Sequence, residues 1–204
     1  MLGVSVHEAR GVVADLLEKL GGPNGAEWLT ASKRFLRKEN PWDGKPVTFL
    51  VWRTITLGAF FKDVNSIKKA LEKNGFQVSD WAADLMSQAA FRLATESIDV
   101  DLVRLTVAEL GFPEGATLQE IYARGKELGL NLCPAEVGPA LRYQYPDQPK
   151  GEWLTIAMEP IAGSDGRPLV LYVDHGRDAR WLDAHWSSPG SFWRSENQFV
   201  FVSK

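Results

Sequence analysis

The sequence predicts an α+β protein, in which a helical N-terminal half is followed by an antiparallel β-meander. Up to about residue 145, most apolar residues recur at helical spacing, in segments that end at glycine. From residue 152 onward, apolar and polar residues alternate in short runs separated by Gly, Asp and Pro. With 204 residues, 45% of them hydrophobic, the chain is long enough to bury a core.

The N-terminal residues are expected to form an antiparallel pair of helices. Ser5 and Glu8 have the spacing of a capping box, and the helix that they begin should end at Gly21. A second helix should run to about Lys38, with basic residues along one side. The linker ENPWDGKP that follows contains two prolines and a glycine. It therefore predicts a boundary between a helical unit, residues 1–45, and a body, residues 46–204.

The body should begin with a strand over residues 47–57, where the apolar residues recur at a spacing of two. Helices are expected over residues 65–75 and from Ser79, whose side chain can cap a helix. A second strand over residues 99–111 and a helix after the capping residue Thr117 should follow.

The two halves of this region have a similar order of elements. Residues 47–86 and 100–143 each contain a strand, a Leu-Gly pair, a polar loop, a helix ending in glycine and a second, capped helix. An internal repeat explains this order, and so do two unrelated helices that each end in glycine. From the sequence alone, both explanations stay open.

Residues 152–204 are expected to form the meander. Its strands should cover residues 152–161, 169–175, 180–186 and 197–203. The turn-forming residues between them predict hairpin connections between consecutive strands. The sequence leaves open whether the two earlier strands join this sheet.

Composition excludes several classes of function. A net charge of -3 and a pI near 5.7 argue against a broad electrostatic interface with duplex nucleic acid. The single cysteine, Cys133, rules out an internal disulfide, and no apolar run approaches the roughly 20 residues that span a bilayer. We therefore expect a cytoplasmic protein without a membrane partner. The sequence contains no GxGxxG, P-loop, GxSxG or HExxH motif, and no cofactor is expected.

The stretch LCPAEVGPALRYQYPDQPKGEWL, residues 132–154, is the most distinctive part of the chain. It combines prolines with charged and aromatic side chains, namely Glu136, Arg142, Tyr143, Tyr145, Asp147, Lys150 and Glu152. The favoured interpretation is a structured corner that joins the helical half to the β half. A ligand or partner surface formed by Arg142, Tyr143, Tyr145 and Lys150 is the second interpretation. The third is a catalytic cleft of Glu136, Arg142, Asp147 and Glu152, joined by His185.

Cys133 and the acidic and histidine residues of the meander are candidates for reactive groups. Pro134 suits the first turn of a helix, which would place the Cys133 thiol at a helix N-terminus, but cysteine is more often a buried apolar residue. Two pairs, Asp174 with His175 and Asp183 with His185, consist of residue types that can bind a metal. Because residues 174 and 175 point to opposite faces of a strand, at most one of them can join the second pair. No metal site is therefore expected.

Tryptophan is frequent, and four of the eight tryptophans lie in the meander. Trp186 and Trp193, which flank SSPGSF, are the two that we expect least to belong to the core and most to contact a partner. The basic strip KRFLRK, residues 33–38, is expected to be a solvated helical face.

The string CPAEVGPALRYQYPDQPKGEWLTIAMEPIAGSDG resembles a family of bacterial hypothetical proteins, in which WRTITLG before it and FW and FVFV after it recur. The resemblance extends from about Phe35 to the end of the chain. It implies a bacterial cytoplasmic protein, and it supplies no catalytic residue and no cofactor.

Two functions follow from these observations as hypotheses. The favoured one is a non-enzymatic binding protein that contacts a macromolecular partner through a Trp-rich sheet face and the corner at residues 142–153. The alternative is a small hydrolase or nuclease-like enzyme with a cleft of carboxylates and arginine. The identity of the partner and the oligomeric state are left open by the sequence.

Overall fold

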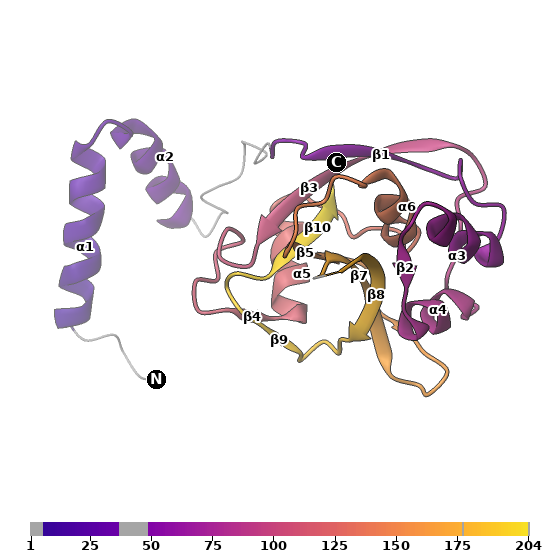
Figure 1. The fold of residues 1–204 in the computed structure, drawn as a ribbon. Helices are drawn as coiled ribbons and strands as arrows, with labels where there is room; N and C mark the ends of the chain where they lie inside the picture. Colours follow the sequence, from indigo (N-terminus) through magenta and orange to yellow (C-terminus); the bar gives the residue numbers. More distant parts are fainter. Residues whose placement is uncertain (1–5, 37–48, 177, 204) are drawn as a thin grey trace. The chain divides into compact units, whose positions relative to one another are not determined.

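The structure, a computed structural model, describes residues 6–36, 49–176 and 178–203. The expected cap Ser5 and the expected linker at residues 39–46 lie outside the described residues. The chain divides into two compact units, Met1–Pro46 and Val47–Lys204, each described by itself below (Figure 1). No helix in the described part of the chain is long and apolar enough to cross a membrane.

The first unit is a pair of helices, α1 (Val6–Gly21) and α2 (Gly25–Leu36). In the turn between them, the backbone at Gly25 lies close to the backbone of Leu20. A Cβ at Gly25 would lie 2.1 Å from the carbonyl oxygen of Leu20, so this position requires glycine. The ammonium group of Lys19 lies 5.0 Å from the centre of the Trp28 ring. Among the described residues of this unit, only the apolar side chain of Ala31 is buried.

The body alternates short helices with strands. Its helices are α3 (Val64–Lys73), α4 (Asp80–Ser87), α5 (Leu118–Glu127) and α6 (Val137–Gln144). Its strands are β1 (Arg53–Leu57), β2 (Gln77–Val78), β3 (Ile98–Thr106), β4 (Ala116–Thr117), β5 (Trp153–Ile156), β6 (Ile161–Ala162), β7 (Pro168–His175), β8 (Arg180–Trp186), β9 (Phe192–Trp193) and β10 (Gln198–Val202). Side chains cap three of the helices: Asp63 for α3, Ser79 for α4 and Thr117 for α5.

The sheet is mixed, so the prediction of a helical half followed by an antiparallel meander is wrong. The strand order is β1-β3-β10-β5-β7-β8-β2, with β6 paired to β7, and β4 and β9 form a separate two-stranded sheet. β10 runs parallel to β5 and antiparallel to β3, and β2 runs parallel to β8. The last strand therefore enters the middle of the sheet instead of extending its edge.

The burial of β10 explains its central place. Phe199, Val200 and Phe201 are each at most 1% exposed, although neighbouring residues point to opposite faces of a strand. A strand that is apolar on both faces is stable only between two other strands with both faces covered. An edge position, which a simple meander would give it, would leave one of these faces in water.

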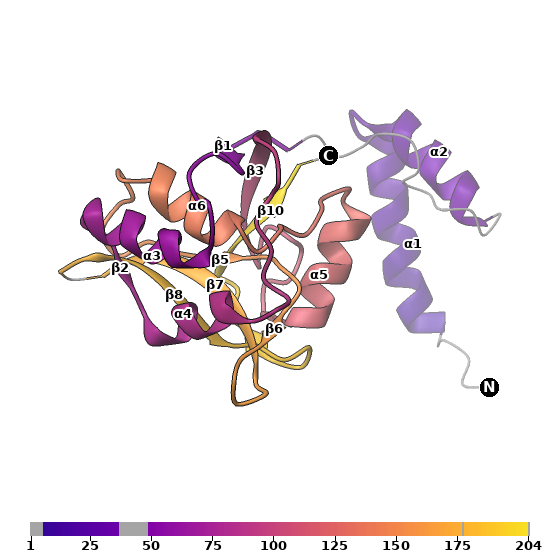
Figure 2. The same ribbon diagram turned by 90° about the vertical axis from the view of Figure 1, so that its right-hand side faces the viewer.

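Helices cover both faces of the sheet, as the two views in Figures 1 and 2 show. On the face that we call the outer face, Val200 packs in one hydrophobic cluster with residues of α3, α4 and α6. On the opposite face, Phe199 and Phe201 pack in a second cluster with α5 and with β4 and β9. A Cβ at Gly125 of α5 would lie 2.7 Å from the Phe201 ring, so glycine lets this helix approach the sheet closely.

The face covered by α5 is concave. His185 on β8 and Phe199 on β10 are three strand spacings apart, which would separate them by roughly 14 Å in a flat sheet. The Trp193 ring nevertheless lies 4.8 Å from the ring of His185 and 4.8 Å from that of Phe199. The sheet must therefore curve around Trp193, which fills its concave side.

The two segments compared as an internal repeat occupy different places. α3 packs on the outer face and α5 on the concave face, and β1 and β3 are antiparallel neighbours.

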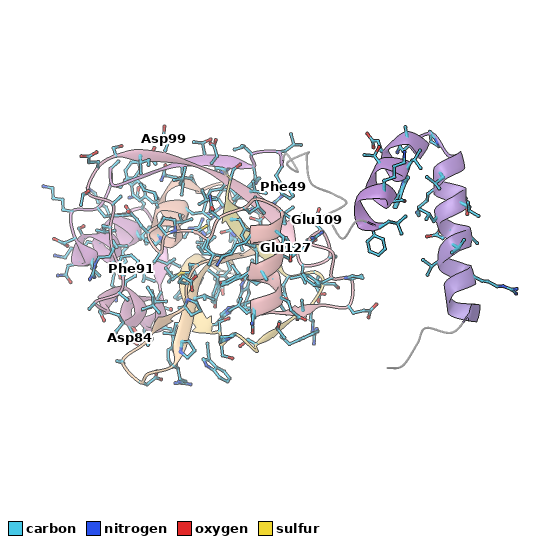
Figure 3. All side chains as sticks on the ribbon, turned by 180° about the vertical axis from the view of Figure 1, so that it is seen from behind. Phe49, Asp84, Phe91, Asp99, Glu109 and Glu127 are labelled. Atoms are coloured by element: carbon cyan, nitrogen blue, oxygen red, sulfur yellow. The ribbon has the colours of Figure 1, made fainter. Side chains whose placement is uncertain are left out.

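Side-chain hydrogen bonds also join β1 to β3. Asp99 of β3, labelled in Figure 3, accepts a hydrogen bond of 2.7 Å from the Thr56 hydroxyl of β1.

Candidate functional site

Arg142 is the centre of the corner at residues 132–154. It is 0% exposed, and its guanidinium donates hydrogen bonds to the Gln148 side chain and to the backbone carbonyls of Tyr145 and Asp174. It also lies 4.8 Å above the Phe76 ring. Burial is the main cause that lowers the pKa of Arg142 to about 10. Arg142 therefore acts as a buried anchor between α6, the following loop and β7.

Glu136 and Gln144 tie the ends of α6 to other segments. The Glu136 carboxylate, 1% exposed, accepts hydrogen bonds from the backbone N–H groups of Gly58 (2.8 Å) and Ala94 (2.6 Å). The Gln144 amide accepts from the backbone N–H of Thr56 at 3.0 Å and donates to its carbonyl at 2.9 Å. Both side chains replace missing backbone partners, which is a structural role.

Tyr145, Glu152 and Asp147 are paired as well. The Tyr145 hydroxyl donates to Glu152 at 2.9 Å, and Glu152 forms an ion pair with Arg104. Burial, followed by the hydrogen bond to Glu152, raises the pKa of Tyr145 to about 12. Asp147 pairs with Arg53 at 3.3 Å near the surface.

Of the other two corner residues considered for binding, Tyr143 packs against Phe60 and Phe61, and Lys150 is exposed. The charged groups proposed for a catalytic cleft are thus engaged in hydrogen bonds within the fold. His185, the fifth candidate, lies on β8, on the concave side of the sheet.

Cys133 is not at a helix N-terminus, because α6 begins four residues later, at Val137. The Cys133 backbone N–H donates to the Ala157 carbonyl at 2.6 Å, and its thiol donates to the Val200 carbonyl at 3.2 Å. Burial raises the pKa of the Cys133 thiol. The thiol therefore behaves as a buried apolar group rather than as a nucleophile.

Trp186 and Trp193 differ in exposure. Trp186 is 60% exposed at the end of β8, and strand alternation places it on the outer face with Leu182 and Ala184. Trp193 is only 9% exposed, inside the curved sheet. The two tryptophans, separated by the six residues SSPGSF, thus have different environments.

A different group of aromatic and acidic residues gathers on the concave face of β5, β7 and β8. The Trp153 and Tyr172 rings stack with their centroids 4.1 Å apart and an interplanar angle of 13°. Asp174 is the cross-strand partner of Trp153 on one side and of Trp181 on the other. Asp183 is the cross-strand partner of Tyr172. We call this group the aromatic–acidic face; it consists of Trp153, Tyr172, Asp174, Trp181 and Asp183.

Asp183 organises one half of the aromatic–acidic face. Its carboxylate accepts hydrogen bonds from the Ser79 hydroxyl, from the backbone N–H of Ala184 and, at 2.7 Å, from the Tyr172 hydroxyl. Burial and the bond to the carboxylate raise the pKa of Tyr172. Asp183 therefore fixes Tyr172 in its stacked position through this hydrogen bond.

Asp174 is in a different situation. No hydrogen bond from another described residue reaches its carboxylate, and burial together with the nearby Asp183 charge raises its pKa. The cations that oppose this rise are Arg142 and His175. Arg142 is buried under the outer face, and the Nδ1 atom of His175 lies 2.6 Å from the carbonyl oxygen of Gln148 in the corner. On the concave face, Asp174 is thus flanked by tryptophan and by a second carboxylate.

Behind this face, three buried polar atoms lack a hydrogen-bond partner in the described residues: Oγ1 of Thr155, Nε2 of His185 and Nε1 of Trp193. The His185 ring stacks between Trp153, Tyr172 and Trp193, and burial lowers the pKa of His185 to about 4. The imidazole is therefore neutral at pH 7 and adds no positive charge to the aromatic–acidic face.

The sequence indicates several of these residues as separate candidates and does not group them. Asp183 and His185 lie on one face of β8 with Trp181, as the alternation indicated, and Asp174 is the one member of its pair that joins them. In the described part of the chain, no three His, Cys, Asp or Glu residues are arranged to hold a metal ion. The alternation within β5, β7 and β8 shows which residues of each strand share a face. The group is recognised only when the register between these strands is known.

Grooves also lie elsewhere on the described part of the chain. One of about 370 Å³ lies between the helices of the first unit, and an open groove of about 460 Å³ runs beside α5, with Tyr122, Glu159 and Pro189 in its lining. Neither groove contains a residue of the corner or of the aromatic–acidic face. No family model, no curated protein and no solved structure matches the chain.

Proposed function

We propose that the chain is a non-enzymatic binding protein whose aromatic–acidic face recognises a positively charged segment of a macromolecular partner. The observation that carries the proposal is the position of Asp174, a partly buried carboxylate between Trp153 and Trp181. The corner contributes Trp153 itself, which begins β5 and is 45% exposed. A protein segment rich in lysine or arginine fits this chemistry.

The physical argument begins with charge. Folding places the Asp174 carboxylate where burial and Asp183 both disfavour its ionised form. A cation that approaches from the concave face would remove this cost, because an opposite charge within about 4–6 Å favours the ionised form. Binding of a cation would thus stabilise the ionised Asp174 carboxylate, which the fold alone disfavours.

The aromatic rings add selectivity for the type of cation. An ammonium or guanidinium group over the face of tryptophan gains about 0.5–2 kcal/mol, and the aliphatic part of a lysine or arginine side chain can cover apolar ring surface. Trp153 is held rigid by its stack on Tyr172, which is in turn fixed by Asp183. A rigid aromatic anchor loses little conformational entropy when a partner binds.

The hydrolase alternative has no comparable observation in its favour. It needs Glu136, Arg142 and Glu152 to present free groups to a common cavity. Each of the three is instead used by backbone groups or by a neighbouring side chain. We therefore do not extend that hypothesis.

The experiment is a binding titration of the full chain with a fluorescein-labelled peptide of alternating lysine and alanine, followed by fluorescence anisotropy. A peptide of alternating glutamate and alanine tests the sign of the charge. We expect the basic peptide to bind, and the variants Asp174→Asn and Trp153→Ala to weaken binding by roughly tenfold or more, which corresponds to about 1.4 kcal/mol. Affinity should also rise with pH across the range in which Asp174 loses its proton.

Two matched controls separate the site from general effects. Glu114→Gln removes an exposed carboxylate outside the site, and Trp186→Ala removes an exposed tryptophan from the outer face. Both variants should bind the basic peptide like the wild type. Equal binding of the acidic peptide, or unchanged affinity in Asp174→Asn, would refute the proposed function.

A further inference from the structure

Basic side chains gather at the end of the β7–β8 hairpin, on the outer face of the sheet. Strand alternation places His175 on this face with Val173. It places Arg180 on the same face with Leu182. His175 and Arg180 are cross-strand partners, so their side chains are neighbours. Lys150 is exposed beside them, because the backbone N–H of the next residue donates a hydrogen bond of 2.8 Å to the His175 carbonyl.

Arg142 of α6 lies beneath this end of the hairpin. Its guanidinium donates a hydrogen bond of 3.3 Å to the carbonyl of Asp174, the residue before His175, and lies over the Phe76 ring. Phe76 immediately precedes β2, and the parallel register of β2 with β8 places it beside Arg180. The two arginines therefore lie close together. After burial, the charge of Arg180 is the next cause that lowers the pKa of Arg142.

The two arginines share no counter-ion among the described residues. The Arg180 guanidinium forms no ion pair and no hydrogen bond there, and the Nε atoms of Arg142 and Arg180 are both buried without an acceptor. The carboxylates whose charges act on Arg142 are those of Asp174 and Glu152. Asp174 projects to the concave face, and Glu152 is already paired with Arg104. Charges withdrawn from water without a partner are unfavourable, so an anion bound here would stabilise both arginines.

Arg180 is accessible to such an anion. The residue is half-buried, and its two terminal nitrogens reach the surface, since they are neither hydrogen-bonded nor among the buried atoms. These nitrogens form a planar fork that matches two oxygens of a phosphate or a carboxylate. Charge distinguishes the two ligands. A phosphate group, with a charge of about −1.5 to −2 at pH 7, can compensate both arginines, whereas a carboxylate can compensate only one.

We propose that the outer end of the β7–β8 hairpin is a binding site for a phosphate group, which Arg180 contacts directly and which the buried charge of Arg142 stabilises from below. His175 and Lys150 lie at the rim of this phosphate site. The aromatic–acidic face lies on the other side of the same two strands and attracts the opposite charge. The inference does not depend on the function proposed for that face, and the two are tested with different ligands.

The test is a calorimetric titration of the full chain with inorganic phosphate at pH 7, with the ionic strength held constant by sodium chloride. We expect one phosphate to bind per chain and acetate to bind more weakly. Arg180→Met keeps the apolar length of the side chain and removes its charge. It should weaken phosphate binding roughly tenfold or more, as expected for the loss of a charged hydrogen bond. Arg194→Met, which changes an exposed arginine outside the site, should bind like the wild type.

Thermal unfolding separates a binding role of Arg180 from a structural one. Added phosphate should raise the unfolding midpoint of the wild type, because it binds only the folded chain, and should leave that of Arg180→Met unchanged. Without phosphate, Arg180→Met should unfold at the same temperature as the wild type or at a higher one, since it removes a like charge from beside Arg142. A lower midpoint would mean that the guanidinium has a partner within the fold, and would overturn the inference.

The remaining outcomes are equally clear. Absence of phosphate binding, equal affinity for acetate, or unchanged phosphate affinity in Arg180→Met would overturn the inference. Glycerol 3-phosphate distinguishes the source of the phosphate group. Tighter binding than that of inorganic phosphate would support the site and place the group on a larger ligand, and weaker binding would support it as a site for the free ion.

Discussion

Arg142 gives the sharpest test of how the corner is built, because nearly all of its contacts would be lost in one substitution. In Arg142→Ala, the Gln148 side chain and the carbonyls of Tyr145 and Asp174 lose their donor, and the Phe76 ring loses the guanidinium above it. All of these groups lie in a part of the fold where Arg142 is 0% exposed, so water cannot simply replace the donor.

The magnitude follows from two opposing contributions. Hydrogen bonds to a charged group contribute about 1.5–3 kcal/mol each, so three of them amount to roughly 6 kcal/mol. Burial of the charge opposes this: the lowering of the Arg142 pKa from its usual value to about 10 corresponds to roughly 3 kcal/mol. The loss of packing over Phe76 adds about 1 kcal/mol. We therefore expect Arg142→Ala to lower the free energy of unfolding by about 4 kcal/mol.

The assay is urea unfolding of the full chain at pH 7, followed by circular dichroism. Arg142→Lys keeps the charge but can serve fewer acceptors, so it should fall between Arg142→Ala and the wild type. Arg194→Ala removes an exposed arginine and should change stability by less than about 0.5 kcal/mol. If Arg142→Ala changes the free energy of unfolding as little as Arg194→Ala does, the account of the corner as an anchored structure is refuted.

Three further predictions concern other buried positions. Glu136→Gln should destabilise the body by about 2 kcal/mol in urea unfolding, since an amide can accept only one of the two backbone N–H bonds that the carboxylate accepts; an unchanged midpoint would contradict its role. Gly125→Ala should cost about 1–3 kcal/mol in the same assay, because its methyl group would lie 2.7 Å from the Phe201 ring, and a neutral result would show that α5 can move away. The pKa of His185 is lowered from 6.5 to about 4 in the folded chain. As pH falls from 6.5 to 4, the unfolded chain therefore binds a proton at His185 and the folded chain does not. This difference lowers the free energy of unfolding by about 3 kcal/mol. His185→Asn should lose that much less between pH 7 and pH 4, and an identical pH dependence in both proteins would show that His185 is not buried as a neutral ring.

The sequence predicted the longer helices and strands of the body, but it missed the short strands β2, β4, β6 and β9 and the place of β10 in the sheet. Hydrophobic alternation and caps such as Ser79 and Thr117 are local signals, and α4 and α5 begin at these residues. Strand pairing is not a local property. The run around Val200 was recognised as a strand, but its apolar residues on both faces indicate a central strand, and only the paired structure shows that it lies between β3 and β5.

The candidate site shows the same division between local and non-local information. The tryptophans of the C-terminal region were noticed in the sequence, but Trp186 and Trp193 were singled out, and the structure places one on the outer face and buries the other. Trp153, Asp174 and Trp181 come from three strands and become neighbours only through cross-strand register. The predicted hairpin connections pair these three strands, but the spacing along the chain does not determine the register that makes Asp174 the partner of both Trp153 and Trp181.

The most direct test of the account follows the indole N–H signals of the tryptophans by ¹H–¹⁵N NMR while the lysine–alanine peptide is added. Each signal can be assigned by single substitution. The proposed function predicts that the signals of Trp153 and Trp181 move, and that those of the exposed Trp81 and Trp186 stay in place. Movement confined to Trp81 or Trp186, or no movement at any tryptophan at saturating peptide, would contradict a binding role for the aromatic–acidic face.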